Sequence, residues 1–185
     1  MSSIFSSTSK SSPTSPSSGG VYTFKLYIYI EVDSLQGKEF SMTNEEFGRK
    51  LTDNKFKKWL DPAEEIDEVS YYTHPLNSWQ IGKGVMYHAF IVFKTNDWYW
   101  SIEKNNAGVT IQRSKNIEHV RDKYYRIKRQ ENWTSGIAMK KSKSVNNKTV
   151  KQLIEHVYEA NYVDEEYGVI QKNCQQFADK IYDFI

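Results

Sequence analysis

The chain has 185 residues, of which 38% are hydrophobic and 26% charged, with a net charge of +2 and a single cysteine. One cysteine cannot form an intramolecular disulfide or a cysteine-rich zinc site, so a disulfide-stabilised scaffold and a zinc finger are excluded. The mean hydropathy is −0.71 and no apolar run approaches 20 residues, which argues against a membrane span. We therefore expect a cytoplasmic protein with a free thiol, and no metal or other cofactor.

The amino-terminal segment differs in composition from the rest of the chain. Ten of its first 20 residues are serine. Such a segment cannot bury enough apolar surface to offset the entropy lost on ordering, so residues 1–20 are predicted to be a disordered tail. Residues 21–185 are long enough for one domain of ordinary size.

The first half of this domain contains one clear strand and two helical stretches. Residues 21–33 alternate in hydrophobicity and predict a strand. Residues 43–46 form a capping box that begins a short helix, and a second helical stretch carries Phe56, Trp59 and Leu60. Residues 64–68 and 71–79 read as irregular, with weak strand potential. The inward face predicted for the first strand is Tyr22, Phe24, Leu26, Ile28, Ile30 and Val32.

A compact β-block follows in the middle of the chain. Residues 85–93 are apolar on both faces and predict a buried strand. Turns at 94–97 and 105–108 separate it from strands at 98–103 and 109–113, which gives a meander of three antiparallel strands.

The carboxy-terminal part changes to helical periodicity. A capping box at 149–152 begins a helix that Asn161 closes, and a last helix has Asn173 as its N-cap and Cys174 at its first position. The predicted fold is α+β, with an antiparallel sheet, helices to one side, and the cysteine helix packed against the strand of residues 85–93.

The position of Cys174 is suited to nucleophilic chemistry. The first turn of a helix stabilises a thiolate through its dipole and its free N–H groups. A nucleophilic cysteine also needs a base, usually histidine. His74 falls in the irregular region, whereas His88 interrupts an otherwise apolar strand and needs a buried partner.

Strand register suggests that partner. A four-residue turn at 94–97 would place Glu103 opposite His88, and a two-residue turn at 96–97 would place it diagonally on the same face. Either arrangement separates the two Cβ atoms by about 5 to 7 Å. Ser101 shares that face and is the alternative candidate.

These residues resemble a known group. Asn173-Cys174-Gln175-Gln176-Phe177 at a helix start, downstream of His88 in a strand, is similar to the circularly permuted papain-like enzymes. That group includes relatives of lecithin:retinol acyltransferase, the phospholipid acyltransferase thiol enzymes and, more distantly, NlpC-type peptidases. The resemblance covers residues 85–185, and residues 21–84 match no family that we can name.

The resemblance implies a thiol hydrolase or acyltransferase that forms a thioester acyl-enzyme on an amide or ester substrate. Lipid substrates are among those that the resemblance allows. It implies Cys174 as nucleophile and His88 as base, with Glu103 or Ser101 as third residue. The Cys174 N–H would contribute to the oxyanion hole, with Gln171 a second donor and Asn173 a further candidate. Many lipid-acting members have a second histidine at the third position, where this chain has Trp-Ser-Ile-Glu-Lys.

Two other functions remain open at this point. The first is a binding module that keeps the papain-like shell without turnover. The second rests on residues 113–148, where eleven Lys or Arg against three acidic residues give a net charge of +8. Such a segment could contact an anionic lipid headgroup, another phosphate or nucleic acid.

Overall fold

The computed structural model describes residues 22–51, 61, 63–75, 87–129, 136–168 and 173–185. The predicted tail at 1–20 and the helical stretch around Phe56, Trp59 and Leu60 lie outside the described residues. Among the helices that are described, none combines the length and apolar character needed to cross a bilayer.

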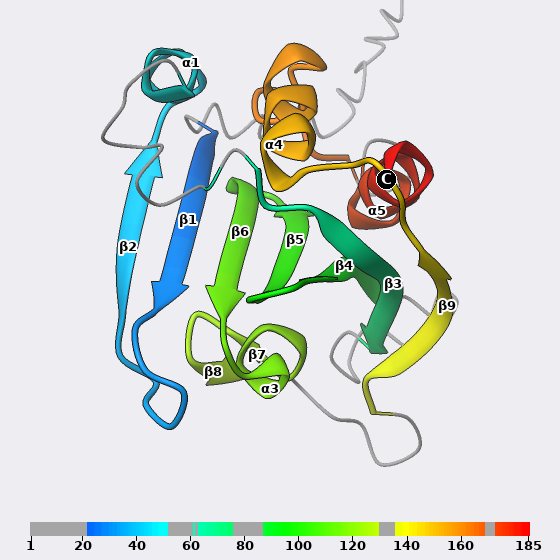
Figure 1. Cartoon of the computed structure of the whole chain (residues 1–185). Coiled ribbons are helices and arrows are strands. Elements are labelled where there is room, and N and C mark those ends of the chain that lie inside the picture. Colours follow the sequence, from blue (N-terminus) through cyan, green and yellow to red (C-terminus); the bar gives the residue numbers. More distant parts are fainter. Residues whose placement is uncertain (1–21, 52–60, 62, 76–86, 130–135, 169–172) are drawn as a thin grey trace, which may run out of the picture.

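The described part of the chain is organised around one seven-stranded sheet with the order β2-β1-β6-β5-β4-β3-β9 (Figure 1). The pair β1 and β6 is parallel, and every other neighbouring pair is antiparallel. The sheet is therefore mixed rather than purely antiparallel. Its strands are β1 (Thr23–Tyr29), β2 (Gly37–Met42), β3 (Ile66–Pro75), β4 (Tyr87–Thr95), β5 (Tyr99–Asn105), β6 (Gly108–Ser114) and β9 (Ala138–Ser144).

Both faces of the central strands are covered. The helices α4 (Val150–Glu159) and α5 (Cys174–Phe184) share the main core with Ile91 and Phe93 of β4. Phe90 and Val92 point the opposite way and pack with Val120 of α3 (Ile117–Arg121). The prediction of an α+β fold with helices packed on a sheet is confirmed. A short helix α1 (Asn44–Leu51) and a small hairpin, β7 (Lys123–Tyr124) and β8 (Ile127–Lys128), complete the described elements.

The predicted meander and helix caps are present. The strands β4, β5 and β6 are antiparallel neighbours, and the first hairpin closes with a Thr95 N–H bond of 2.9 Å to the Trp98 carbonyl. At the second hairpin, Gly108 has a φ of 127°, and a Cβ there would lie 2.0 Å from the Thr23 carbonyl oxygen. Only glycine lets β1 approach so closely.

Three predictions about the sheet were wrong or incomplete. Residues 66–75 are not irregular: they form β3, whose bulges disturb the alternation that would have revealed it. The strands β2 and β9 were not predicted. Each lies at an edge of the sheet, pairs with one neighbour and contains lysines, so its alternation of apolar and polar residues is weak. The first strand ends at Tyr29, so Ile30 and Val32 are 57% and 48% exposed rather than inward.

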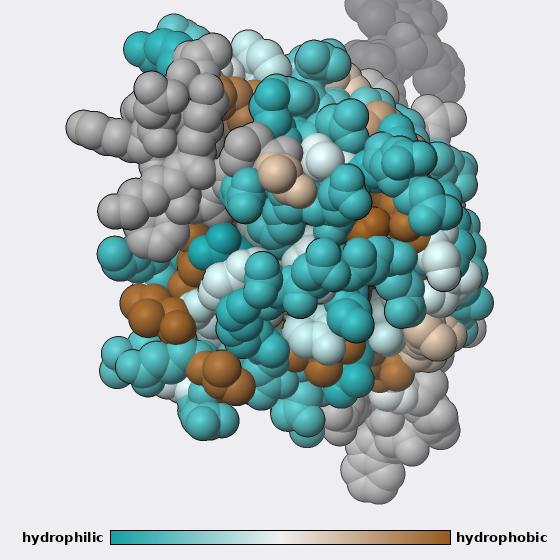
Figure 2. Space-filling view, viewed as in Figure 1, coloured by the Kyte–Doolittle hydropathy of each residue, from teal (hydrophilic) through white to brown (hydrophobic). Residues whose placement is uncertain are grey.

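The visible surface is mainly hydrophilic. Figure 2 shows scattered hydrophobic groups, with several at the lower left, over the end of β1 and β2.

One buried cation fixes the segment that leads to α5. Lys104 is fully buried on β5, and its ammonium donates to the carbonyls of Tyr162 at 2.8 Å and Glu165 at 2.6 Å, and to the Glu165 carboxylate at 3.2 Å. A buried ammonium needs such partners to offset its lost hydration. This cluster ties the segment after α4 to the sheet.

We predict that Lys104→Met destabilises the protein by about 3 kcal/mol, because it removes a buried cation that serves two backbone carbonyls and the Glu165 carboxylate. The matched control is Lys180→Met, which removes a 43% exposed cation 3.4 Å from the same Glu165 carboxylate. We expect the control to cost less than about 0.5 kcal/mol. Urea unfolding of both variants measures the difference, and equal losses would contradict this account of Lys104.

Candidate active site

The start of α5 is fastened to the start of β4. Asn173 caps the helix, because its side-chain oxygen accepts from the N–H groups of Gln175 at 3.0 Å and Gln176 at 3.2 Å. The side-chain amide of Gln175 donates to the Tyr87 carbonyl at 3.1 Å, and the Cys174 sulfur lies 4.0 Å from the same oxygen. These contacts place the thiol beside His88, the next residue along β4.

The imidazole of His88 connects the thiol to a buried carboxylate. In the observed register Ile91 faces Ile102, so the turn is the two-residue one and Glu103 is the diagonal neighbour of His88. His88 Nε2 lies 2.7 Å from Glu103 Oε2. The Cys174 side chain acts on the same imidazole and raises its pKa. Because Nε2 is committed to Glu103, Nδ1 is the nitrogen that serves the thiol.

An arginine that sequence reasoning missed holds the other side of Glu103. Arg129 follows β8, is 4% exposed, and grips the carboxylate with two nitrogens. Nη1 donates to Oε2 at 2.9 Å, and Nη2 pairs with Oε1. The guanidinium also lies 3.9 Å from the centre of the Phe90 ring. No motif marks this arginine among the eleven cations of residues 113–148.

The electrostatics favour an ion pair between thiol and imidazole. Burial lowers the pKa of His88, but hydrogen bonds to Cys174 and Glu103 and their charges outweigh it and raise the pKa to about 9. Burial raises the pKa of Cys174, but the His88 hydrogen bond and charge, with donation from the Ala89 N–H and the Tyr167 side chain, lower it overall. Against its burial, the Arg129 charge and hydrogen bonds hold the pKa of Glu103 well below its usual range.

A second histidine stands next to His88, contrary to the irregular segment predicted around it. His74 pairs with His88 across β3 and β4, and the two ring centres are 5.1 Å apart. Burial, with the charges of His88 and Arg129, lowers the pKa of His74 to about 4, so it is neutral at pH 7. Both histidines line a cavity of about 290 Å³ together with Glu103, Arg129 and the β7–β8 hairpin.

The remaining candidates are placed differently. Ser101 is buried on the face of Glu103, but its hydroxyl accepts from the Gln112 amide at 3.1 Å. The Asn173 side chain caps α5, and Gln171 lies outside the described residues. Tyr167, which no sequence signal marked, is close enough to the thiol for its side chain to lower the pKa of Cys174. In the part of the chain that is described, no three His, Cys, Asp or Glu side chains lie close enough to share a metal ion.

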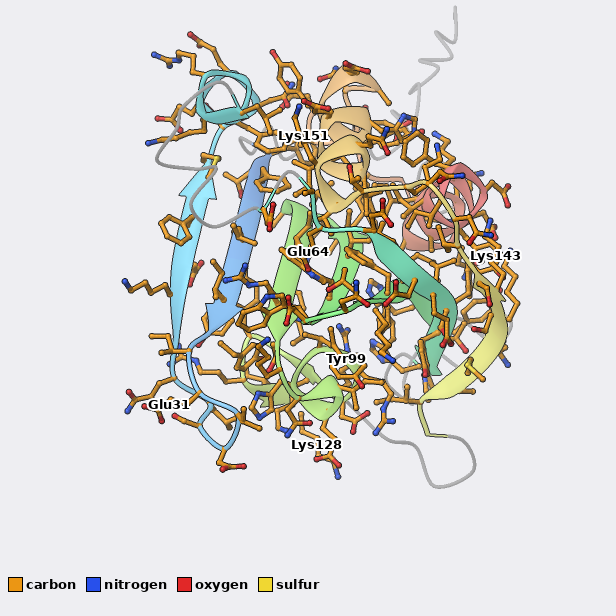
Figure 3. The ribbon with its side chains drawn as sticks, viewed as in Figure 1. Glu31, Glu64, Tyr99, Lys128, Lys143 and Lys151 are labelled. Atoms are coloured by element: carbon orange, nitrogen blue, oxygen red, sulfur yellow. The ribbon has the colours of Figure 1, made fainter. Side chains whose placement is uncertain are left out.

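The cations of residues 113–148 do not form one surface. Arg113 and Arg129 are buried, and the Arg113 guanidinium lies 4.2 Å from the Trp98 ring centre. Figure 3 shows Lys128 in the β7–β8 hairpin and Lys143 on β9, in separate regions of the molecule. The run in the sequence is therefore divided in space.

We predict that iodoacetamide alkylates Cys174 with an inflection below the value of about 8.5 for a free thiol. Thiolate is lost as the pH falls through this lowered pKa, and above pH 9 the imidazolium that supports it is lost. Because the chain has one cysteine, the labelled residue is unambiguous. His88→Asn should return the inflection to about 8.5 or above, and an unchanged inflection would contradict the ion pair.

The comparisons with known proteins agree with a thiol site. Residues 35–185 match the family model described as "PPPDE putative peptidase domain". Neither the curated proteins nor the solved structures gave a match. A cysteine-peptidase family fits the coarse expectation of a papain-like thiol hydrolase, and nothing in it singles out the lecithin:retinol acyltransferase or NlpC relatives. Because the match spans 151 of 185 residues, the chain belongs to the PPPDE peptidase-domain family.

Proposed function

We propose that this protein is a cysteine hydrolase that cleaves an amide bond of a peptide or protein through a thioester intermediate on Cys174. The observation that carries the proposal is the placement of Cys174 at the start of α5, beside the Tyr87 carbonyl of β4, next to His88, whose imidazole lies 2.7 Å from the Glu103 carboxylate. A nucleophile, a base and a group that orients the base are the parts that such chemistry needs. The peptidase-domain family supports an amide as the bond attacked.

In the proposed mechanism, the Cys174 thiolate attacks the carbonyl carbon and His88 carries the proton on Nδ1. Glu103 accepts from Nε2–H and so fixes the tautomer. The Cys174 N–H and the Tyr167 hydroxyl, both beside the sulfur, are the donors that we assign to the oxyanion. His88 then gives its proton to the leaving amine as the C–N bond breaks. Water, deprotonated by His88, hydrolyses the thioester and frees the acid.

Other acceptors and substrates use the same intermediate. An amine or alcohol in place of water would make the protein an acyltransferase, and an ester, including a lipid ester, would give the same thioester. Residues 113–148 were also predicted to contact a lipid headgroup, a phosphate or nucleic acid. This stays a prediction, because the cations of these residues do not form one basic surface that would favour it. A binding module without turnover is the alternative to all of these.

We predict that a mixture of internally quenched peptides, with isopeptide-linked equivalents, contains substrates that the full-length protein cleaves. Cys174→Ala should abolish cleavage, and Glu103→Gln should reduce kcat by about 10- to 100-fold because His88 loses its orienting carboxylate. The matched control is Ser101→Ala, on the same strand and face, which should keep activity within about threefold. Added hydroxylamine should capture the thioester as a hydroxamate.

The result that would overturn the proposal is also defined. A thiol that is alkylated below pH 7.5, in a protein that cleaves none of these peptides and yields no hydroxamate, would favour the binding module. Cleavage that survives Cys174→Ala would remove the cysteine mechanism itself.

A further inference from the structure

We propose that Arg129 is a positioning residue of this site, which sets the proton affinities of Cys174 and His88 by acting through Glu103. The inference rests on the proposed function, because it assigns a role within the same site. It concerns a residue that neither the cysteine motif nor the family match distinguishes.

The contact geometry fits a dedicated partner for Glu103 rather than a surface ion pair. The side chains of Arg129 and Glu103 are 2% and 4% exposed. Both carboxylate oxygens are engaged by the guanidinium, and Oε2 also accepts from His88 Nε2 at 2.7 Å. Stacking on Phe90 fixes the plane of the guanidinium. A planar two-pronged donor held on an aromatic ring leaves the carboxylate little freedom to rotate.

Hydrogen bonds of the β7–β8 hairpin hold Arg129 in this position. The hairpin of β7 and β8 turns at Tyr125 and Arg126, which have φ values of 47° and 70°. Two non-glycine residues in this region cost free energy, so the turn must be held by its surroundings. The Tyr125 N–H donates to Gln112 Oε1 at 2.9 Å, and the Arg129 N–H closes the hairpin at 2.8 Å on the Asp122 carbonyl.

Charge balance explains why an arginine is needed. A carboxylate that is fully buried would otherwise be uncompensated whenever His88 is neutral, and its own pKa would rise until it took the proton. Paired with Arg129, Glu103 stays ionised and acts only as an acceptor, so the proton remains on His88 Nε2 and Nδ1 is left to exchange protons with Cys174.

The sign of the effect follows from the charges. Removing a positive charge makes every neighbouring site hold its proton more tightly, so both Cys174 and His88 should have higher pKa values without Arg129. Removing the negative charge of Glu103 should lower both. The other titratable groups that face this cluster come from four parts of the fold. They are His74 and Tyr71 from β3, Tyr29 from β1, Tyr124, Tyr125 and Lys128 from the β7–β8 hairpin, and Tyr167 from the segment before α5.

We therefore predict opposite shifts in the pH profile of Cys174 alkylation by iodoacetamide. Arg129→Met should move the inflection upward by about one pH unit, and Glu103→Gln should move it downward by about one unit. The double variant restores the net charge, and its inflection should return to within about 0.3 units of the unmodified protein. Because alkylation needs no turnover, the measurement does not require a known substrate.

Two further variants separate this role from a purely structural one. Arg129→Lys keeps the charge without the two-pronged geometry, so its inflection should stay within about 0.3 units while kcat falls. Arg121→Met, the matched control, removes a nearby arginine that is paired with Asp122, and should shift nothing. Circular dichroism identifies any variant that fails to fold. If Arg129→Met does not fold, the charge-neutral double variant and Arg129→Lys, each compared with Glu103→Gln, carry the test.

The outcomes distinguish the two proposals. An unmodified protein whose inflection lies at about 8.5 would overturn the activated thiol and the proposed function with it. A low inflection that Arg129→Met leaves unmoved, in a folded variant, would overturn the role of Arg129 alone.

Discussion

The arrangement of this molecule depends on one buried carboxylate. Glu103 lies in the centre of the sheet, where an uncompensated charge would cost several kcal/mol. Two groups share it, the imidazole of His88 on one side and the guanidinium of Arg129 on the other. The first connects the carboxylate to the thiol, and the second connects it to the β7–β8 hairpin. Structural and chemical requirements therefore meet in the same ion cluster.

The sheet brings these groups together from opposite faces. His88, Phe90 and Val92 point toward α3 and the hairpin, whereas α5 packs on the other face with Ile91 and Phe93. The thiol reaches the imidazole because Cys174 is the first residue of α5 and lies at the start of β4, beside the Tyr87 carbonyl. A cysteine one turn further along α5 would face the apolar core, where burial alone would raise its pKa.

Local patterns were sufficient to predict much of the site. Alternation and turn residues gave β4, β5 and β6, and both turns left open by the sequence put Glu103 on the face of His88. The observed register is the diagonal one. The Asn173 cap gave the start of α5. These features depend on residues near one another in the chain, so a single sequence contains them.

The rest depends on tertiary contacts that leave no local trace. The strand β3 gains its order by pairing on both sides with β4 and β9, which are distant in sequence. In the sequence, Arg129 is one of several cations in a basic run. Only the folded hairpin directs its side chain toward Glu103. No local sequence pattern identifies Tyr167 or His74 as a site residue. Tyr167 comes close to the Cys174 thiol, and His74 to the His88 imidazole, only in the folded chain.

The single cysteine has a consequence for how this protein can be followed as it folds. The groups that lower its pKa are His88 and the Ala89 N–H on β4 and the side chain of Tyr167, and the β4 groups lie far from the sulfur in the unfolded chain. An unfolded thiol is weakly ionised at neutral pH, and the native one is stabilised as thiolate. The ionisation of this thiol at neutral pH therefore distinguishes molecules in which α5 has docked from unfolded ones. The ionisation of the Cys174 sulfur thus reports whether the tertiary structure around it has formed.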